Sequence, residues 1–267
     1  MSWVKKRVLV TVKAAPEPSK RYGDAVCTAG LTEDGEWIRL YPVPLDLWRR
    51  GRGFKKFDWI EVECKKASQE EKLGRKESHK IRSDSLKVVD RSLSGNGKVD
   101  WAGRNQLLYP NRSASIEALR EAYNKDRTSL GMVRVGELID FYKSEQLTES
   151  ELNHRRVKQL VFSDVEDGRG GGLKPQWILN QIPHIFRYKF KCETSACSGH
   201  DMTCEDWELF EAYRLWPERY KTEERTFEKI KDKFFYLFRD KKDLHFFMGT
   251  DSQYPSWMII GVYYPPK

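Results

Sequence analysis

Three of the five cysteines and one of the five histidines of this chain lie within thirteen consecutive residues. Cys192, Cys197, His200 and Cys204 follow one another there with the spacing C-x4-C-x2-H-x3-C. Thiolate and imidazole groups are the ligands that tetrahedral zinc prefers, and the small residues between them let the backbone fold back around an ion. The sequence therefore predicts one zinc ion, structural in role, held by these four side chains.

Other interpretations of the cysteines stay open on the sequence alone. They can be buried small side chains, or two of them can form a disulfide. Cys192 or Cys204 can also lie outside the metal site, with His184 or the distant Cys27 completing the four ligands. An iron–sulfur cluster fits less well, because its usual ligands are four cysteines.

Acidic residues near the same segment raise the question of catalysis. Asp201, Glu205, Asp206 and Glu208, together with His200, can hold a divalent ion for phosphodiester cleavage. The last three acids, however, fall in the first turn of an expected helix, where the helix dipole alone favours them. The sequence contains no G-x-S-x-G, H-E-x-x-H or P-loop motif. We therefore predict no catalytic residues and retain a metal-dependent nuclease, or another enzyme of nucleic-acid metabolism, as the alternative.

A basic run at residues 47–56 is the second chemical signal. Its charged and aromatic members are Trp48, Arg49, Arg50, Arg52, Phe54, Lys55 and Lys56. Guanidinium groups pair with phosphate oxygens, and aromatic rings stack on bases. The run therefore predicts contact with the backbone of DNA or RNA, although many such runs are only solvated turns.

Residues 186–191 alternate aromatic and basic side chains. If the aromatic side chains face the core of a half-buried strand, Arg187 and Lys189 line its other face with Lys191 as an electropositive stripe. We add Arg187 and Lys189 to the predicted nucleic-acid contacts.

The formal net charge of +8 is unevenly distributed. Residues 1–160 contain 32 Lys and Arg against 23 Asp and Glu, whereas residues 161–267 contain 16 against 17. Because neutralised phosphates release their counterions and thereby drive binding, this asymmetry favours a polyanionic partner for the amino-terminal part.

Composition narrows the class of protein. Hydrophobic residues make up 39% and aromatic residues 13% of the 267 positions, which is typical of a folded globular chain. No signal peptide is recognisable, and no apolar run approaches the roughly 20 residues needed to cross a bilayer. We therefore expect a cytoplasmic protein with no membrane partner, in which an odd number of cysteines does not form a disulfide framework.

The patterning predicts the elements that must position these groups. We expect strands at 7–13 and 57–64, a hairpin turn at Asp34-Gly35, and a helix at 113–124. Residues 130–143 are expected to form strands with a turn at Gly136. Further on we expect a short helix at 176–181, a helix at 205–216, and another helix that follows Pro217 and is capped by Thr222. Strands at 243–250 and 256–264 end the chain.

The predicted fold class is α+β with two parts. Residues 1–162 form a strand-rich sheet or small barrel, a glycine-rich linker covers 163–174, and residues 175–267 form a smaller α+β part. In this second part a metal knuckle, meaning a short ion-closed loop, joins a strand to a helix. The knuckle resembles compact zinc sites, and the amino-terminal half resembles small barrels that bind nucleic acid. The leading hypothesis is a zinc-containing nucleic-acid-binding protein, with a protein-interaction subunit as a further alternative.

Overall fold

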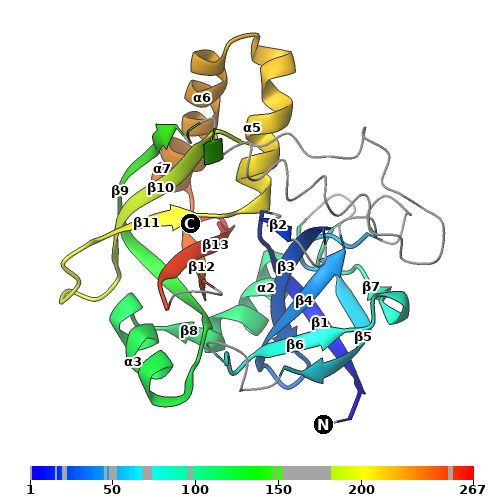
Figure 1. The fold of residues 1–267 in the computed structure, drawn as a ribbon. Helices are drawn as coiled ribbons and strands as arrows, with labels where there is room; N and C mark the ends of the chain where they lie inside the picture. The colour runs from blue at the N-terminus through cyan, green and yellow to red at the C-terminus, as the bar shows by residue number, and fades with distance from the viewer. Residues whose placement is uncertain are drawn as a thin grey trace.

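The computed structural model describes residues 2–15, 17–19, 23–44, 47, 53–67, 74–95, 99–146, 148, 150–151, 182–251 and 255–267. Figure 1 shows two strand-rich parts side by side, with helices α5 and α6 projecting from the second. The predicted linker at 163–174, the expected short helix at 176–181 and residues 48–52 of the basic run lie outside the described residues.

The first part of the chain forms a closed barrel of five strands. Its strands are β1 (Val4–Lys13), β3 (Gly23–Thr32), β4 (Trp37–Pro44), β5 (Trp59–Lys66) and β6 (Ser78–Ile81). Each is hydrogen-bonded to the next in the order β1-β3-β4-β6-β5, and β5 pairs with β1 to close the ring. The short strands β2 (Glu17–Ser19) and β7 (Lys87–Asp90) pair with β3 and β5.

Alternation of side chains explains why these segments enclose a core. Val8 and Val10 of β1 are fully buried inside the barrel with Ile60 and Val62 of β5. In β5 the buried residues alternate with partly exposed ones, as a strand with one face on a core requires, whereas β1 is buried on both faces from Val8 to Lys13. The predicted strands in these two regions and the predicted hairpin between β3 and β4 are confirmed.

The second part forms another closed five-stranded barrel. Its strands are β9 (Leu130–Gln146), β10 (His184–Cys192), β11 (His200–Cys204), β12 (His245–Thr250) and β13 (Trp257–Tyr263). They follow the order β10-β11-β13-β12-β9, and β9 pairs with β10 to close the ring. The two-residue strand β8 (Arg112–Ser113) runs beside β9.

Both barrels have the same connectivity. When the five barrel strands are numbered along the chain, each ring has the order 1-2-3-5-4, and the third and fifth strands are parallel. This is the arrangement of the OB-fold, a five-stranded Greek-key barrel. The strand-rich α+β description and the amino-terminal barrel are therefore confirmed, while the second barrel was not predicted.

Helices fill the connections between strands. They are η1 (Ser83–Ser85), α2 (Trp101–Leu108), η2 (Tyr109–Asn111), α3 (Ile116–Asp126), α5 (Trp207–Tyr220), α6 (Glu223–Lys231), η4 (Asp232–Leu237) and α7 (Phe238–Lys241). Ser115, Asp206 and Thr222 cap α3, α5 and α6 by accepting backbone N–H bonds, so the predicted cap at Thr222 is confirmed. Pro217 does not separate two helices as predicted, because α5 continues through it to Tyr220.

Strand β9 corrects two further expectations. It runs unbroken from Leu130 to Gln146, with no turn at Gly136. A Cβ at Gly136 would lie 2.7 Å from the Cys192 carbonyl oxygen, so this glycine allows β9 and β10 to approach closely. Because β9 pairs with β10 and β12, the two sheets divide before β8, well ahead of the boundary that the sequence placed at 163.

An apolar layer joins the two barrels. Its members include Leu9, Val12, Ala29 and Leu31 from the first barrel and Met132, Phe247, Ile260 and Tyr263 from the second. Trp37 of β4 also meets Phe247 edge to face, with ring centroids 6.1 Å apart. The outward faces of β1, β3 and β4 are therefore partly covered by the second barrel.

A buried ion pair crosses the same junction. Lys56, in the loop that leads to β5, places its Nζ 3.0 Å from the Val262 carbonyl oxygen and 3.5 Å from both Asp206 and Glu208. Only 8% of the Lys56 side chain and 1% of the Asp206 side chain are exposed. Burial alone would lower the pKa of Lys56, but the two carboxylates outweigh it and raise that pKa above its ordinary value.

We predict that Lys56→Met destabilises the folded chain strongly. Removing the cation leaves the buried Asp206 carboxylate unpaired, which costs about 3–5 kcal/mol of the free energy of unfolding in urea titrations. Lys55→Met is the matched control, because Lys55 is exposed, and should change that free energy by about 0.5 kcal/mol or less. Adding Asp206→Asn to Lys56→Met should recover part of the loss, since asparagine still caps α5. Equal effects of the Lys55 and Lys56 substitutions would contradict the buried pair.

Candidate metal centre

Two cysteines and a histidine meet where β10 ends and β11 begins. The turn between the strands brings Cys197 back to both of them: its Sγ lies 3.2 Å from His200 Nε2 and accepts the Cys192 backbone N–H at 3.2 Å. Gly199 adopts a φ of 106° directly before His200, a conformation that L side chains rarely adopt. The predicted grouping of Cys192, Cys197 and His200 is therefore present.

The fourth group comes from another part of the chain. Glu117, in the first turn of α3, places Oε1 3.6 Å from His200 Nε2. The ligand atoms of Glu117, Cys192, Cys197 and His200 all lie within 4.8 Å of one another. Sequence reasoning missed Glu117, because an acid in the first turn of a helix is expected without any metal.

These separations suit a tetrahedral ion. With zinc–sulfur bonds of about 2.3 Å and zinc–nitrogen or zinc–oxygen bonds of about 2.0–2.1 Å, tetrahedral ligands are separated by about 3.6 Å for sulfur and nitrogen and about 3.4 Å for nitrogen and oxygen. The observed 3.2 Å and 3.6 Å are close to these values. The cluster can therefore hold a metal ion.

Cys204 does not belong to this group, which corrects the prediction. His200 and Cys204 are the two ends of β11 and pair with Phe190 and Phe186 respectively. A strand rises about 3.3 Å per residue, so the ends lie about 13 Å apart. Cys204 is instead fully buried in the core of the second barrel, where burial raises the pKa of its thiol.

The other ligands considered from the sequence have different partners. His184 lies 2.8 Å from Glu223, and Cys27 accepts a bond from Arg39 at 3.2 Å. All five cysteines are free thiols, so the structure contains no disulfide.

Without an ion, the electrostatics of the cluster favour a neutral Cys192 thiol and a neutral His200 imidazole. Burial raises the pKa of Cys192 to about 12, although a hydrogen bond from the Ile116 backbone opposes the shift. Burial also lowers the pKa of His200, against the attraction of Glu117. A bound cation reverses the balance for the thiols, because a coordinating thiol is deprotonated.

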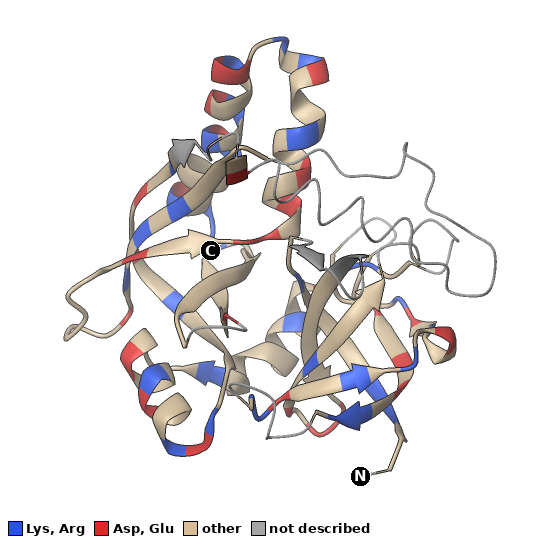
Figure 2. Cartoon of the chain, viewed as in Figure 1, with Lys and Arg blue, Asp and Glu red and all other residues tan. Residues whose placement is uncertain are grey.

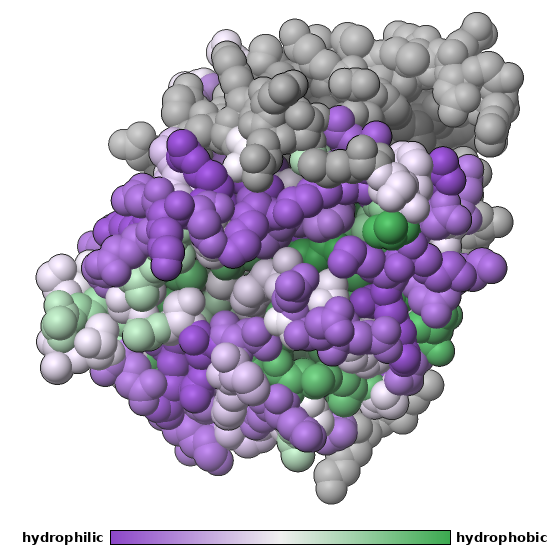
Figure 3. All heavy atoms as spheres, turned by 90° about the horizontal axis from the view of Figure 1, so that it is seen from below, coloured by the Kyte–Doolittle hydropathy of each residue, from purple (hydrophilic) through white to green (hydrophobic). Residues whose placement is uncertain are grey.

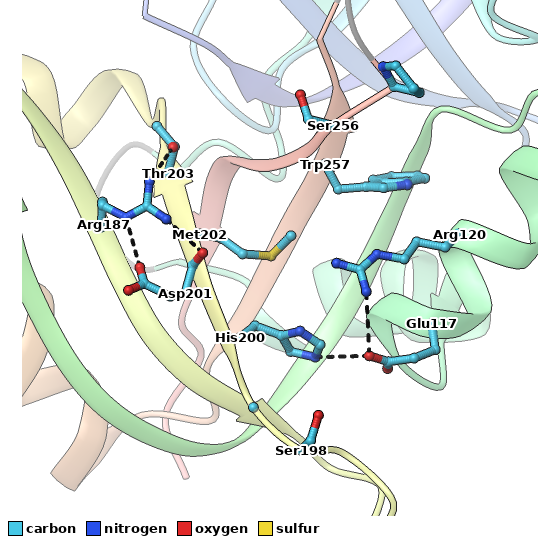
Figure 4. A pocket seen from close by; sticks show the side chains of 12 residues that line it. Glu117, Arg120, Arg187, Ser198, His200, Asp201, Met202, Thr203, Ser256 and Trp257 are labelled. Carbon is cyan, nitrogen blue, oxygen red and sulfur yellow. Dashed lines mark hydrogen bonds and ion pairs between the residues drawn. The ribbon is translucent and has the colours of Figure 1, made fainter.

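A cleft of about 540 Å³ opens beside the cluster. Figure 4 shows Glu117 and Arg120 of α3 on one side and His200 and Asp201 of β11 on the other. Trp257, at the start of β13, also lines the cleft. The Arg120 guanidinium lies 3.9 Å from Glu117 Oε1, so that this carboxylate faces His200 and Arg120 together.

The acids that the sequence offered for catalysis have structural partners. Asp206 caps α5, Glu208 pairs with Lys56, and Asp201 binds Arg187 at 2.8 Å. This agrees with the expectation that helix position accounts for Asp206 and Glu208.

The predicted nucleic-acid contacts are dispersed. Phe54 is 1% exposed and belongs to the core of the first barrel, so it is not a stacking platform. Lys56 is buried in its ion pair rather than directed at solvent, whereas Lys55 is exposed. Trp48, Arg49, Arg50 and Arg52 lie outside the described residues.

The predicted stripe on β10 is oriented as expected, but acids balance its charge. Phe186, Tyr188 and Phe190 are fully buried. On the outer face Arg187 pairs with Asp201, and Lys191 lies 3.0 Å from Glu137. Lys189 is exposed and lies over the Tyr142 ring, 5.2 Å from its centroid.

A stronger concentration of cations lies on the first barrel. Lys65 of β5 is directly opposite Lys80 of β6, and Lys66 is opposite His79. Lys6 of β1 is near His79 and acts to lower its pKa, although burial is the larger cause. Figure 2 shows blue segments on strands of the first barrel in the part that lies towards the amino terminus.

Comparisons with known proteins divide the chain where the sheets divide. Residues 4–110 match the family model described as "Domain of unknown function (DUF8758)", and residues 112–267 match "Domain of unknown function (DUF8757)". The search of curated proteins found no match. A solved structure of a replication protein A heterotrimer bound to ssDNA is similar over 100% of this chain and 50% of that chain, with 9% identity and a TM-score of 0.40. The protein therefore spans about half the length of the replication protein A chain that it matches.

Within the described residues, no helix has the length and apolar character needed to span a membrane. The cytoplasmic location remains a prediction.

We predict that metal content depends on Cys197 and not on Cys204. Protein purified without added metal should contain about one ion per chain by elemental analysis, and Cys197→Ala and His200→Ala should each lower that content sharply. Cys204→Ala is the matched control from the same segment and should retain the ion. If Cys204→Ala loses the metal while Cys197→Ala keeps it, the geometric assignment fails.

Proposed function

Because the chain belongs to the family described as domain of unknown function DUF8757, a description that assigns no activity, we propose its function from its surface. The protein binds nucleic acid through the phosphate backbone, using the first barrel, and carries a zinc ion in the second.

The location of the charge supports this proposal. Residues 1–110 contain 23 Lys and Arg against 15 Asp and Glu, whereas residues 111–267 contain 25 of each. The whole formal excess of +8 therefore belongs to the first barrel and its appended segments. A field concentrated on one barrel attracts a polyanion and gains free energy from released counterions.

The cross-strand lysines are the single observation that carries the proposal. Lys65 of β5 and Lys80 of β6 are directly opposite each other, so the two ammonium groups can approach one phosphate from the same face of the sheet. In the described part of the chain, Lys6, Lys65 and Lys66 have no carboxylate within ion-pair distance. A phosphate group on the outer face of the sheet can pair with Lys65 and Lys80 together, while Lys6 and Lys66, which lie on the other face at the end of the barrel, add to the positive field.

Two further features fit this surface. The face of the molecule shown in Figure 3 is predominantly hydrophilic, with apolar residues in separate patches, as suits a wet polar interface. The predicted contacts Arg49, Arg50 and Arg52 belong to the same part of the sequence and add to its charge. They remain part of the proposal as a second contact segment.

The zinc ion serves this function as a scaffold. Cys192, Cys197 and His200 hold it at the β10–β11 turn, and Glu117 links the turn to α3. Two thiolates, an imidazole and a carboxylate are a ligand set that suits zinc better than magnesium or calcium. A different metal, or none, in the elemental analysis would remove this part of the proposal and leave the nucleic-acid surface untouched.

We predict that Lys65→Ala combined with Lys80→Ala weakens nucleic-acid binding without unfolding the protein. Fluorescence anisotropy with a mixed-sequence oligonucleotide should give a log–log salt slope flatter by about 1.8 on duplex DNA, or about 1.4 on a single strand. The loss should be similar across sequences, because phosphates carry no base identity. The free energy of unfolding should fall by no more than about 1 kcal/mol, since neither side chain belongs to the buried core.

Two controls sharpen this test. Lys229→Ala with Arg239→Ala removes two exposed cations from helices α6 and α7, each of which is paired with an aspartate. This double substitution should leave the salt slope of binding unchanged. Arg49→Glu with Arg52→Glu measures the second contact segment separately. If neither cation set of the first barrel changes the slope, the nucleic-acid proposal is wrong, and the protein-interaction reading takes its place.

A further inference from the structure

The four ligands of the metal cluster differ in location and exposure. Cys192, Cys197 and His200 all belong to the β10–β11 turn, and each of these side chains is at most 8% exposed. Glu117 comes from α3, and 47% of its side chain is exposed. Three buried ligand side chains are therefore held by one turn, while the fourth reaches in from the solvent side.

The chemistry of the fourth ligand differs as well. Structural zinc sites are usually closed by cysteine and histidine alone, whereas catalytic sites have three protein ligands and one exchangeable position. Zinc with two thiolates is formally neutral, so the fourth ligand sets the net charge of the site, and the further negative charge of a phosphate in place of Glu117 is offset by Arg120 beside it. An exposed carboxylate is thus a ligand that can be exchanged.

Two features beside the cluster suit an exchange of ligands. Arg120 is a second partner for the Glu117 carboxylate, and the cleft has room for an incoming group. Glu117 Oε1 is shared between His200 and Arg120, whose guanidinium lies on the same side of the cleft. Cavities of roughly 300–1,000 Å³ accommodate small ligands, and this cleft has about 540 Å³. Its lining combines Arg120, which suits a phosphate oxygen, with Trp257, which offers an aromatic surface.

We propose that the metal centre is open towards this cleft: Glu117 is a displaceable ligand, and a phosphate oxygen of a bound molecule takes its place beside Arg120. The inference rests on the zinc centre of the proposed function but not on the basic surface of the first barrel. The ligand class is a phosphate-bearing small molecule, such as a nucleotide, or the phosphorylated end of a nucleic acid.

Cobalt replacement tests the open position without any assay of activity. The full chain loaded with Co²⁺ should show thiolate-to-cobalt charge-transfer bands and tetrahedral d–d bands. Addition of inorganic phosphate should shift the d–d bands and leave the charge-transfer bands in place, because the cysteines stay bound. A spectrum that does not respond to phosphate, in the wild type and in Glu117→Ala alike, would overturn the proposal.

Variants separate an open site from a closed one. Glu117→Ala should retain one cobalt per chain and should bind phosphate more tightly, because no carboxylate competes. Cys197→Ala should lose the charge-transfer bands with the metal. If Glu117→Ala loses the metal as completely as Cys197→Ala, the site is a closed four-ligand centre and the proposal is wrong. If the wild type binds no cobalt at all, the zinc assignment itself fails.

Further measurements test the role of Arg120 and identify the molecule that carries the phosphate. Arg120→Ala should weaken the phosphate response several-fold at unchanged metal content, while Lys125→Ala, on the same helix but outside the cleft lining, should have no effect. A mononucleotide that competes with phosphate identifies a small-molecule ligand. A response to a 5′-phosphorylated oligonucleotide but not to its 5′-hydroxyl form, with no response to the mononucleotide, identifies a nucleic-acid end. An unchanged response in Arg120→Ala would remove Arg120 from the site.

Discussion

The Asp206 carboxylate is the contact on which the relation between the two barrels depends. One of its oxygens accepts the Leu209 N–H and so caps α5, and the other accepts both the Val262 N–H of β13 and a bond from Lys56 of the first barrel. Next to it, the Ala15 N–H donates to the Glu205 carbonyl at 2.8 Å. A helix, a barrel strand and a loop of the other barrel thus meet at one buried charge. Such a charge persists in the interior only because both of its oxygens accept hydrogen bonds and a cation lies beside one of them.

The junction also determines which surfaces remain for function. The apolar layer covers outward positions of β1, β3 and β4, and the metal cluster lies on the far side of the second barrel, where α3 meets the β10–β11 turn. Charge and metal are thereby separated into different barrels. The first has the cationic excess, and the second is formally balanced and contains the thiol ligands. This separation allows either feature to be altered by mutation without direct contact with the other.

The sequence predicted the features that depend on local periodicity. Alternation in β10 identified its buried face. Thr222 was recognised as a cap because capping needs only neighbouring backbone groups. Prediction from the sequence failed for the groups whose partners are distant in the chain. Cys204 looked like a ligand because four-residue spacing brings side chains together in a turn but separates them along a strand. Glu117 and the role of Lys56 were missed, since their partners lie far away in the chain and a buried cation looks like any other in a basic run.

The connectivity of a barrel is a poor guide to its binding face here. OB-folds commonly bind their ligands on the second and third strands, which in the first barrel are β3 and β4. Their outward residues Ala29, Leu31 and Trp37 pack in or against the layer between the barrels, so a polyanion cannot reach them there while the barrels stay joined. The lysines of β5 and β6 lie outside this layer. Function has to be argued from such side chains rather than from the fold, because the same barrel accepts different surfaces on different strands.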